Sequence, residues 1–251
     1  MTIRTLISAL LASFCLTAAA APAEDGPKNI LITYRSKPAD RPAFRRYLIE
    51  TELNRLKGWK AEGHLANYQI LFNPYVDQDT WDAMLVVEFA DYAQAVGWKK
   101  IERDLPGGLD EAGQALAVPQ QTYEADLTWS EGTVSADPSR VYYVIPYEYR
   151  NAAEYSDYVD GYVLPQVRGW MKEGVLTSYR IFMNRYPVGR RWDSLFVYEY
   201  KDDAAFGKRE GTIAKVRQTL KDDPRWKALS DNKANIRSES DNTIAEALGG
   251  R

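Results

Sequence analysis

The side chains with the clearest chemical potential are carboxylates and arginines placed among apolar neighbours in predicted strands. Glu199 lies between Val197 and Tyr200, so water should have poor access to its carboxylate. A buried carboxylate needs a cationic or hydrogen-bonding partner, or else it takes up a proton. Strand alternation places such groups on one face of the predicted sheets, and a tyrosine-rich strand adds one aromatic residue. The predicted ligand-binding set is Arg35, Gln69, Glu88, Glu124, Tyr147, Arg180, Glu199, Arg237 and Glu239, with Asp126 and Asp241 on the same face.

Two interpretations of this polar set stay open on the sequence alone. In the first, the groups line a polar pocket that binds a small molecule or transfers protons. In the second, they form a structural network of ion pairs that holds two sheets in register. Because the residue types permit both, no catalytic residue is assigned.

Histidine and cysteine are nearly absent, which excludes several kinds of site. Cys15 is the only cysteine and lies in an N-terminal apolar segment, so a processed chain has no thiolate nucleophile, disulfide or cysteine-bound metal. His64 is the only histidine, which argues against a Ser-His-Asp hydrolase. A lone histidine can ligate haem, but no further ligand accompanies it. We therefore expect no metal and no cofactor, and haem binding through His64 is kept as an alternative hypothesis.

The chain contains the same pattern twice. Residues 58–93 align with residues 169–204 without a gap, across segments that read as helix, strand and turn. This predicts one fold built twice. The identical pairs include Trp59/Trp170, Gly63/Gly174, Asn73/Asn184 and Trp81/Trp192. A residue kept in both copies most simply does the same structural job, such as packing a helix end or closing a turn.

Each copy has the element order β-α-β-β-α-β, because helical spacing and strand alternation follow one another in that order. In the first copy, strands are expected at 29–34, 64–72, 80–89 and 121–129, and helices from Asp40 or Pro42 to Gly58, at 92–103 and at 109–116. In the second copy, strands are expected at 141–149, 176–184, 192–200 and 235–244, and helices at 152–172, 202–220 and 223–229. The predicted organisation is a signal peptide at 1–23, repeat one at 28–130, a linker at 131–139 and repeat two at 140–246.

This order predicts an α+β fold of two ferredoxin-like units, each with an antiparallel sheet and both helices on one face. The other face still carries Leu71, Val86 and Val197, too much apolar surface to stay wet, so two sheets should pack together. With its helix starts FADYA and YKDDA, the chain resembles the dimeric α/β-barrel superfamily, in particular NIPSNAP-like, EthD-like and antibiotic-biosynthesis-monooxygenase-like proteins. The resemblance implies a tandem-repeat member that closes a pseudo-dimeric barrel. The superfamily also includes haem-binding relatives of chlorite dismutase.

The N-terminus and the charge pattern predict an exported protein. Arg4, the apolar run 6–20 and the small residues 21–23 form a secretory signal, cleaved after Ala20 or Ala23. The net charge is −3 and the basic residues are interleaved with acidic ones, which disfavours nucleic-acid binding. We expect a soluble periplasmic or secreted protein, free of the membrane after processing, that is a monomer with pseudo-twofold symmetry or a homodimer.

The predicted function is small-molecule binding or protein interaction, since no catalytic motif is recognisable. A first alternative is a cofactor-independent monooxygenase or isomerase that uses the polar lumen of the barrel. A second alternative is haem binding through His64.

Overall fold

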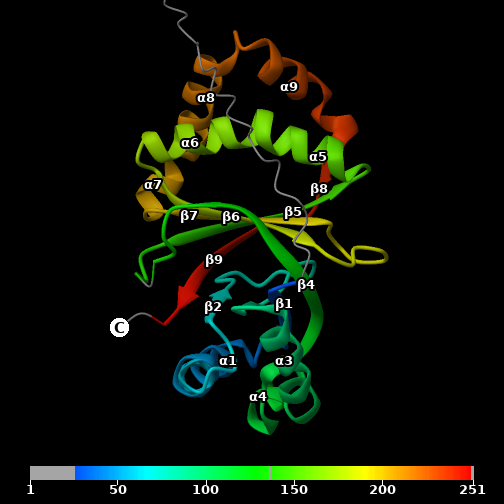
Figure 1. Ribbon diagram of the computed structural model, residues 1–251. Helices are drawn as coiled ribbons and strands as arrows, with labels where there is room; N and C mark the ends of the chain where they lie inside the picture. The colour runs from blue at the N-terminus through cyan, green and yellow to red at the C-terminus, as the bar shows by residue number, and fades with distance from the viewer. Residues whose placement is uncertain (1–25, 136, 250–251) are drawn as a thin grey trace, which may run out of the picture.

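A computed structural model of the chain describes residues 26–135 and 137–249. The predicted signal peptide at 1–23 lies outside the described residues. The molecule has four layers, with the helices of each half on the outside and two layers of strands between them (Figure 1). No helix in the described ranges combines the length and apolar character needed to cross a bilayer.

The first half begins with a short strand and ends with a long one. Its elements are β1 (Asn29–Ser36), α1 (Arg41–Tyr47), η1 (Leu48–Glu52), α2 (Leu53–Ala61), β2 (Asn67–Phe72), β3 (Ala83–Glu88), α3 (Tyr92–Asp104), η2 (Pro106–Gly108), α4 (Glu111–Leu116) and β4 (Ala117–Glu131). The segments α1, η1 and α2 form one continuous helical rod with a π-helical turn in its middle.

The second half follows the same order with longer helices at its end. Its elements are β5 (Val141–Tyr149), α5 (Ala152–Tyr158), η3 (Val159–Val163), α6 (Leu164–Lys172), β6 (Leu176–Asn184), β7 (Ser194–Tyr200), α7 (Asp203–Gly207), α8 (Arg209–Leu220), α9 (Pro224–Ile236), β8 (Arg237–Glu239) and β9 (Thr243–Leu248). The π-helical turns of the two halves, η1 and η3, stand 111 residues apart, which is the offset of the sequence repeat.

The strands form one large antiparallel sheet with the order β7-β6-β4-β1-β3-β2-β9-β5-β8, and β7 also pairs with β5. The first half contributes β4-β1-β3-β2 and the second contributes β9-β5-β7-β6, so strand order is the same when counted within each half. The long strand β4 joins the halves, because its first part pairs with β1 and its last part with β6. The predicted α+β class is confirmed.

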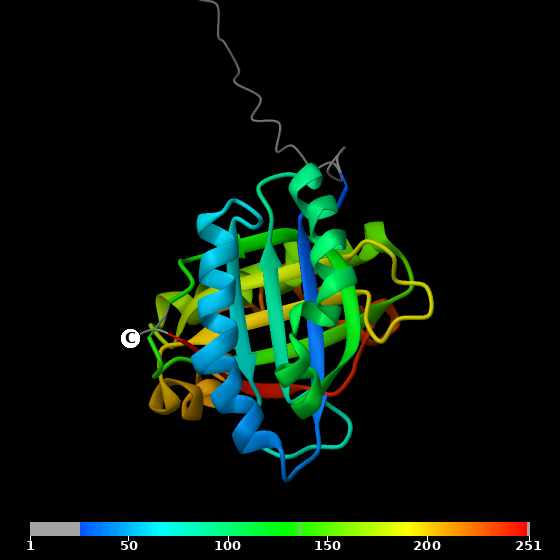
Figure 2. The same cartoon turned by 90° about the horizontal axis from the view of Figure 1, so that it is seen from below.

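Three apolar cores follow from this arrangement. One lies under the helices of each half, and a third lies between the strand layers, where Leu31, Met84 and Phe182 are at most 1% exposed. Seen from below, α1–α2 and α3 lie over the first-half strands, and the second-half strands cross behind them (Figure 2). Successive residues in a strand therefore contact different cores: Ile30 packs under helices and Leu31 packs between strand layers.

Glycine ends the helical rod in both halves. Gly63 has φ +78° and Gly174 has φ +75°, in the left-handed region that other residues avoid. The amide of His64 donates to the carbonyl of Trp59 at 2.8 Å, and Val175 repeats this contact with Trp170 at 3.3 Å. These bonds satisfy carbonyls at the helix end, in the manner of a Schellman cap, and turn the chain towards β2 or β6.

The last predicted strand differs from the structure. The helix predicted at 223–229 extends to Ile236 as α9. The strand predicted at 235–244 therefore begins later, and residues 240–242 divide it into β8 and β9. The break faces Pro146 of β5, which has no amide hydrogen to donate; its carbonyl accepts from the Ser240 amide at 3.0 Å. In the first half, the corresponding part of β4 stays continuous and absorbs an irregularity as a bulge beside Thr33 and Tyr34.

Candidate functional site

Four predicted ligand-binding residues occupy the inter-layer face of their strands. Each of these residues stands two positions along its strand from a residue of the core between the strand layers, so it points to the same face. The pairs are Gln69 and Leu71, Glu88 and Val86, Arg180 and Phe182, and Glu199 and Val197. Arg180 donates from Nη2 to Oε1 of Gln69, which links β6 to β2. Burial lowers the pKa of the Arg180 guanidinium, against the opposing influence of Tyr142, Glu199 and Glu88. Here the structure brings predicted residues together.

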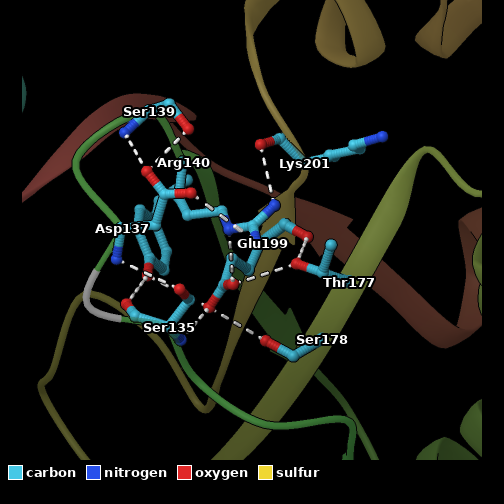
Figure 3. A network of polar contacts seen from close by, with 9 residues as sticks. Ser135, Asp137, Ser139, Arg140, Thr177, Ser178, Glu199 and Lys201 are labelled. Carbon is cyan, nitrogen blue, oxygen red and sulfur yellow. Dashed lines mark hydrogen bonds and ion pairs between the residues drawn. The ribbon is translucent and has the colours of Figure 1, made fainter.

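Glu199 is held by a dense set of donors (Figure 3). Its side chain is 1% exposed. It accepts hydrogen bonds at 2.9–3.1 Å from the Ser135 amide and from the hydroxyls of Tyr142, Thr177 and Ser178. Nε of the Arg140 guanidinium lies 3.6 Å from Oε1 of Glu199. These contacts tie the segment before β5 to the end of β7, which favours the structural interpretation of this carboxylate.

Glu124 and Asp126 lie on the helix-facing side of β4, and the predicted placement of both is wrong. Glu124 is directly opposite Ile30 in the β1–β4 pairing, and opposite residues share a sheet face. Ile30 belongs to the core under the helices. Asp126 forms an ion pair with Arg185 at 3.0 Å. Alternation along one strand gives two faces but does not say which one turns inward; the neighbouring strand decides that.

Tyr147, Arg237 and Glu239 form a separate cluster under the helices, which corrects the predicted placement of Arg237 and Glu239. The Arg237 guanidinium lies 4.8 Å from the centre of the Tyr147 ring and 3.2 Å from the Glu239 carboxylate. It also donates to the Tyr158 hydroxyl at 3.2 Å. Burial raises the pKa of Tyr147 well above its ordinary value. This cluster joins α5 to the edge strand β8 and is remote in register from Glu199.

The remaining two predicted residues lie elsewhere. Leu31 and Gln69 both pair with Val86 and therefore lie at the same level of the sheet. Arg35 is four residues beyond Leu31 on β1, which is about 13 Å along the strand, and is therefore distant from Gln69. Asp241 lines a small cavity of about 60 Å³ together with Trp81 and Trp192. The residues predicted as one site are therefore distributed over several places in the fold.

The asparagines repeated in both halves close the hairpins. Asn73 donates from Nδ2 to the Trp81 carbonyl at 3.3 Å and accepts from the Tyr75 amide at 2.9 Å. Asn184 makes the same pair of contacts with Trp192 at 2.9 Å and Tyr186 at 3.1 Å. The sequence identity between the halves at these positions thus has a shared structural cause.

A cavity of about 320 Å³ lies under α3 of the first half. The helix contributes Tyr92, Ala95, Val96 and Trp98, and the opposite wall contains Ile30 and Thr122 of β1 and β4. Pro27 and four charged residues complete the lining, the charged ones being Lys99, Glu102, Arg103 and Glu124. A mostly apolar hollow with a few polar groups is the usual form of a small-molecule site.

The second half fills the corresponding space with aromatic rings. Phe206 lies four residues after the helix cap Asp202, as Ala95 lies four residues after Asp91. Tyr143 pairs with Tyr198, as Ile30 pairs with Val87. The rings of Tyr143 and Phe206 lie 5.8 Å apart and close the space. Isoleucine and alanine cannot fill that volume, so the hollow under α3 remains open.

The inner wall of the cavity is fixed by hydrogen bonds. The indole of Trp98 donates to Oε2 of Glu102 at 3.0 Å, and the Gly107 amide donates to Oε1 at 2.8 Å. Gly107 has φ +64°, and its carbonyl accepts from the buried Tyr34 hydroxyl at 2.6 Å. Because both oxygens of Glu102 are held, the Trp98 ring and this carboxylate have defined positions in the wall.

A second buried carboxylate lies behind this wall. Glu52 is 1% exposed, and its Oε2 accepts from Arg55 at 2.6 Å and from the Tyr47 hydroxyl at 3.2 Å. Its Oε1 is buried beside Gly108, without a hydrogen-bond partner in the described part of the chain. Burial raises the pKa of Glu52 to about 7, although Arg55 and Tyr47 pull it down.

Comparison with known proteins shows likeness in structure alone. No protein-family model matches the chain, and no curated protein matches it by sequence. A monooxygenase-like protein from Lactobacillus acidophilus is 14% identical with a TM-score of 0.53, over 90% of this chain and 95% of that one. A chlorite dismutase from Candidatus Nitrospira defluvii is 9% identical with a TM-score of 0.51, over 89% and 92%. A heme-binding protein from Thermus thermophilus is 10% identical with a TM-score of 0.50, over 90% and 92%.

At such low sequence identity, the structural likeness shows the fold alone. The neighbours are ferredoxin-like proteins of the dimeric α/β-barrel kind. They also correct one expectation. The sequence predicts no cofactor, whereas the neighbours include a heme-binding protein and chlorite dismutases, so haem belongs to the ligands found on this fold. The described residues contain no cluster of three or more His, Cys, Asp or Glu side chains suited to a metal ion.

His64 does not fit as a haem ligand. Its side chain is 54% exposed at the end of the helical rod, 3.3 Å from Glu62, and it lines neither of the two cavities. Among the residues that line the large cavity, only Tyr92 is of a type that commonly ligates haem iron, and it is 36% exposed.

The large cavity is what the sequence reasoning missed. Its polar lining includes one predicted residue, Glu124, but Trp98, Glu102 and Ala95 were not singled out. A signal was present: continuing the repeat alignment past residue 93 sets Ala95 against Phe206. A large-to-small difference at a core position marks a local loss of volume in one copy.

Proposed function

We propose that this chain is a small-molecule-binding protein whose ligand occupies the cavity between α3 and the strands β1 and β4. The observation that carries the proposal is the contrast between the halves: Tyr143 and Phe206 close a space that Ile30 and Ala95 leave open. At the repeat offset the first half has Trp98 where the second half has Arg209, and this ring still leaves a cavity of about 320 Å³ unfilled. Unfilled apolar space removes contacts that stabilise a fold. A ligand that fills this space restores such contacts.

The scaffold of this proposal is a duplicated ferredoxin-like unit, with repeats at 28–130 and 140–246 and a linker at 131–139. We infer a pseudo-dimeric barrel within one chain, related in plan to NIPSNAP-like and EthD-like proteins. Equal strand order in the halves and the pairing of β7 with β5 support it. Export by a signal at 1–23 to the periplasm or medium is part of the proposal and rests on the N-terminal sequence.

An enzymatic use of the same cavity is the second candidate function. The observation that favours it is Glu102, a carboxylate fixed by Trp98 and Gly107 in the cavity wall, where it can accept a proton from a bound molecule. The test is turnover of any ligand identified below, compared between the native chain and Glu102→Gln. Loss of turnover with retained binding supports catalysis, and equal turnover contradicts it.

The decisive experiment is native mass spectrometry and a visible spectrum of the exported protein, alongside two matched variants. Ala95→Phe restores the ring found in the second half and should displace the ligand. Ala93→Phe adds the same ring to an exposed position of the same helix and should not. Retained ligand mass in the native chain and in Ala93→Phe, but not in Ala95→Phe, supports the proposal. Equal retention by a folded Ala95→Phe contradicts it.

A further inference from the structure

The polar lining of the cavity differs from the second half in one consistent way. At the repeat offset, Glu102 stands where the second half has Ile213, which is 7% exposed in its core. Glu124 pairs with Ile30, as Ile244 pairs with Tyr143, so Glu124 also stands where the second half has isoleucine. Two carboxylates have thus replaced two aliphatic side chains on opposite walls of the hollow.

The two carboxylates are not equally satisfied. Glu102 accepts from Trp98 and Gly107 on its two oxygens. Glu124 is half-buried, and none of the hydrogen bonds or ion pairs between described residues involves its carboxylate. Its oxygens are not among the buried side-chain atoms that lack a partner, so they keep contact with solvent and are accessible to a donor on a ligand. The cavity carboxylate that is open to a ligand is therefore Glu124.

The cationic side chains of the lining do not change this polarity. Lys99 and Arg103 line the cavity from the same face of α3 as Ala95, and both are exposed, so their long side chains can extend the charges into water. Charges in water are screened, whereas the half-buried Glu124 acts in a medium of lower dielectric.

We propose that the cavity selects an amphipathic amine, with its ammonium group bound by Glu124 and its apolar body against Ile30, Ala95 and Trp98. This inference rests on the proposed ligand site and specifies its chemical class. The amine donates to Glu124 and fills the apolar space beside Ala95 and Ile30. An aromatic and an aliphatic body satisfy the same geometry, so the test includes both.

The test uses ligands that share a body and differ in the head group. One series is 2-phenylethylamine, 2-phenylethanol and 3-phenylpropanoate; the other is hexylamine, hexanol and hexanoate. Binding to the full-length processed protein is measured by calorimetry or by ligand-observed NMR at neutral pH. The variants are Glu124→Gln, which keeps the shape and removes the charge, and Glu148→Gln, an exposed control on β5.

The expected result is that the amine of at least one series binds about tenfold or more tightly than its alcohol and carboxylate, and that Glu124→Gln removes this preference while Glu148→Gln keeps it. Equal binding of all three head groups, or preference for the carboxylate, overturns the amine class; if Ala95→Phe still abolishes that binding, the site itself stands. Failure of every probe to bind at millimolar concentration overturns the amine class alone, because ligand retention in native mass spectra judges the site independently.

Discussion

Replacing Glu52 by glutamine should remove a large part of the pH dependence of stability. Glu52 is buried behind the cavity wall, and burial raises its pKa from the ordinary 4.5 to about 7. The unfolded chain exposes this carboxyl and returns its pKa to the ordinary value. A carboxyl with a higher pKa in the folded state binds more protons when folded, so stability falls as the pH rises between the two values.

The magnitude follows from the two pKa values. Below pH 4.5 the carboxyl is protonated in both states and contributes no penalty. Above pH 7 it is ionised in both, and the folded chain carries the full cost of burying the charge, roughly 3 kcal/mol at 1.36 kcal/mol per pKa unit. Glutamine is neutral throughout. Arg55 stays charged over this range. Loss of its ion pair with residue 52 therefore changes the unfolding free energy of the variant by a similar amount at every pH and does not change its dependence on pH.

The assay is urea unfolding of the native chain and of Glu52→Gln at several pH values from 4.5 to 8.5. As the pH rises, the unfolding free energy of the native chain should fall by about 3 kcal/mol relative to that of Glu52→Gln. The exposed Glu148→Gln serves as the control and should parallel the native profile. Parallel profiles for the native chain and Glu52→Gln would refute the reasoning, since they would mean that Glu52 is ionised at no cost.

Three further predictions concern stability, measured by urea unfolding at pH 7. Asp82→Asn breaks a buried ion pair with Arg41, whose partners are 3% and 7% exposed, and should cost about 3–5 kcal/mol; a loss below about 1 kcal/mol would show that Arg41 is hydrated instead. Gly63→Ala should cost about 1–2 kcal/mol because its φ is +78°, whereas Gly58→Ala, inside α2 with open space around it, should stabilise by about 0.5–1 kcal/mol. Glu199→Gln should cost about 1–3 kcal/mol by setting an amide against hydroxyl and amide donors, and unchanged stability would argue for a functional role.

The sequence-based prediction succeeded where local chemistry dominates. The strand at Val141–Tyr149 and the strand at Leu176–Asn184 have the predicted limits, because alternation and flanking polar residues define each one locally. The turn-closing asparagines and the helix-ending glycines were also expected from the repeat. The last strand was predicted as one piece because nothing local reveals that Pro146, about ninety residues earlier, faces residues 240–242.

The prediction of the site was less successful, for a reason of register. Gln69 and Arg180 lie on the predicted inter-layer face and are hydrogen-bonded there, while Glu124, Arg237 and Glu239 lie on the opposite side of their strands. Which face of a strand turns inward is decided by its neighbour and by what packs on it, and a shift of one residue exchanges the faces.

By itself, the sequence determined the repeated residue pattern of 58–93 and 169–204, the α+β class, the local ends of most elements and the scarcity of histidine and cysteine, since each of these depends on residue types and short spacings. The tertiary structure decided where volume is missing. A cavity is a difference between the space enclosed by distant elements and the side chains that fill it. The space beside Ala95 and Ile30 exists only because α3, β1 and β4 enclose it in the folded chain. Comparison with Tyr143 and Phe206 at the equivalent positions of the second half shows which side chains are smaller.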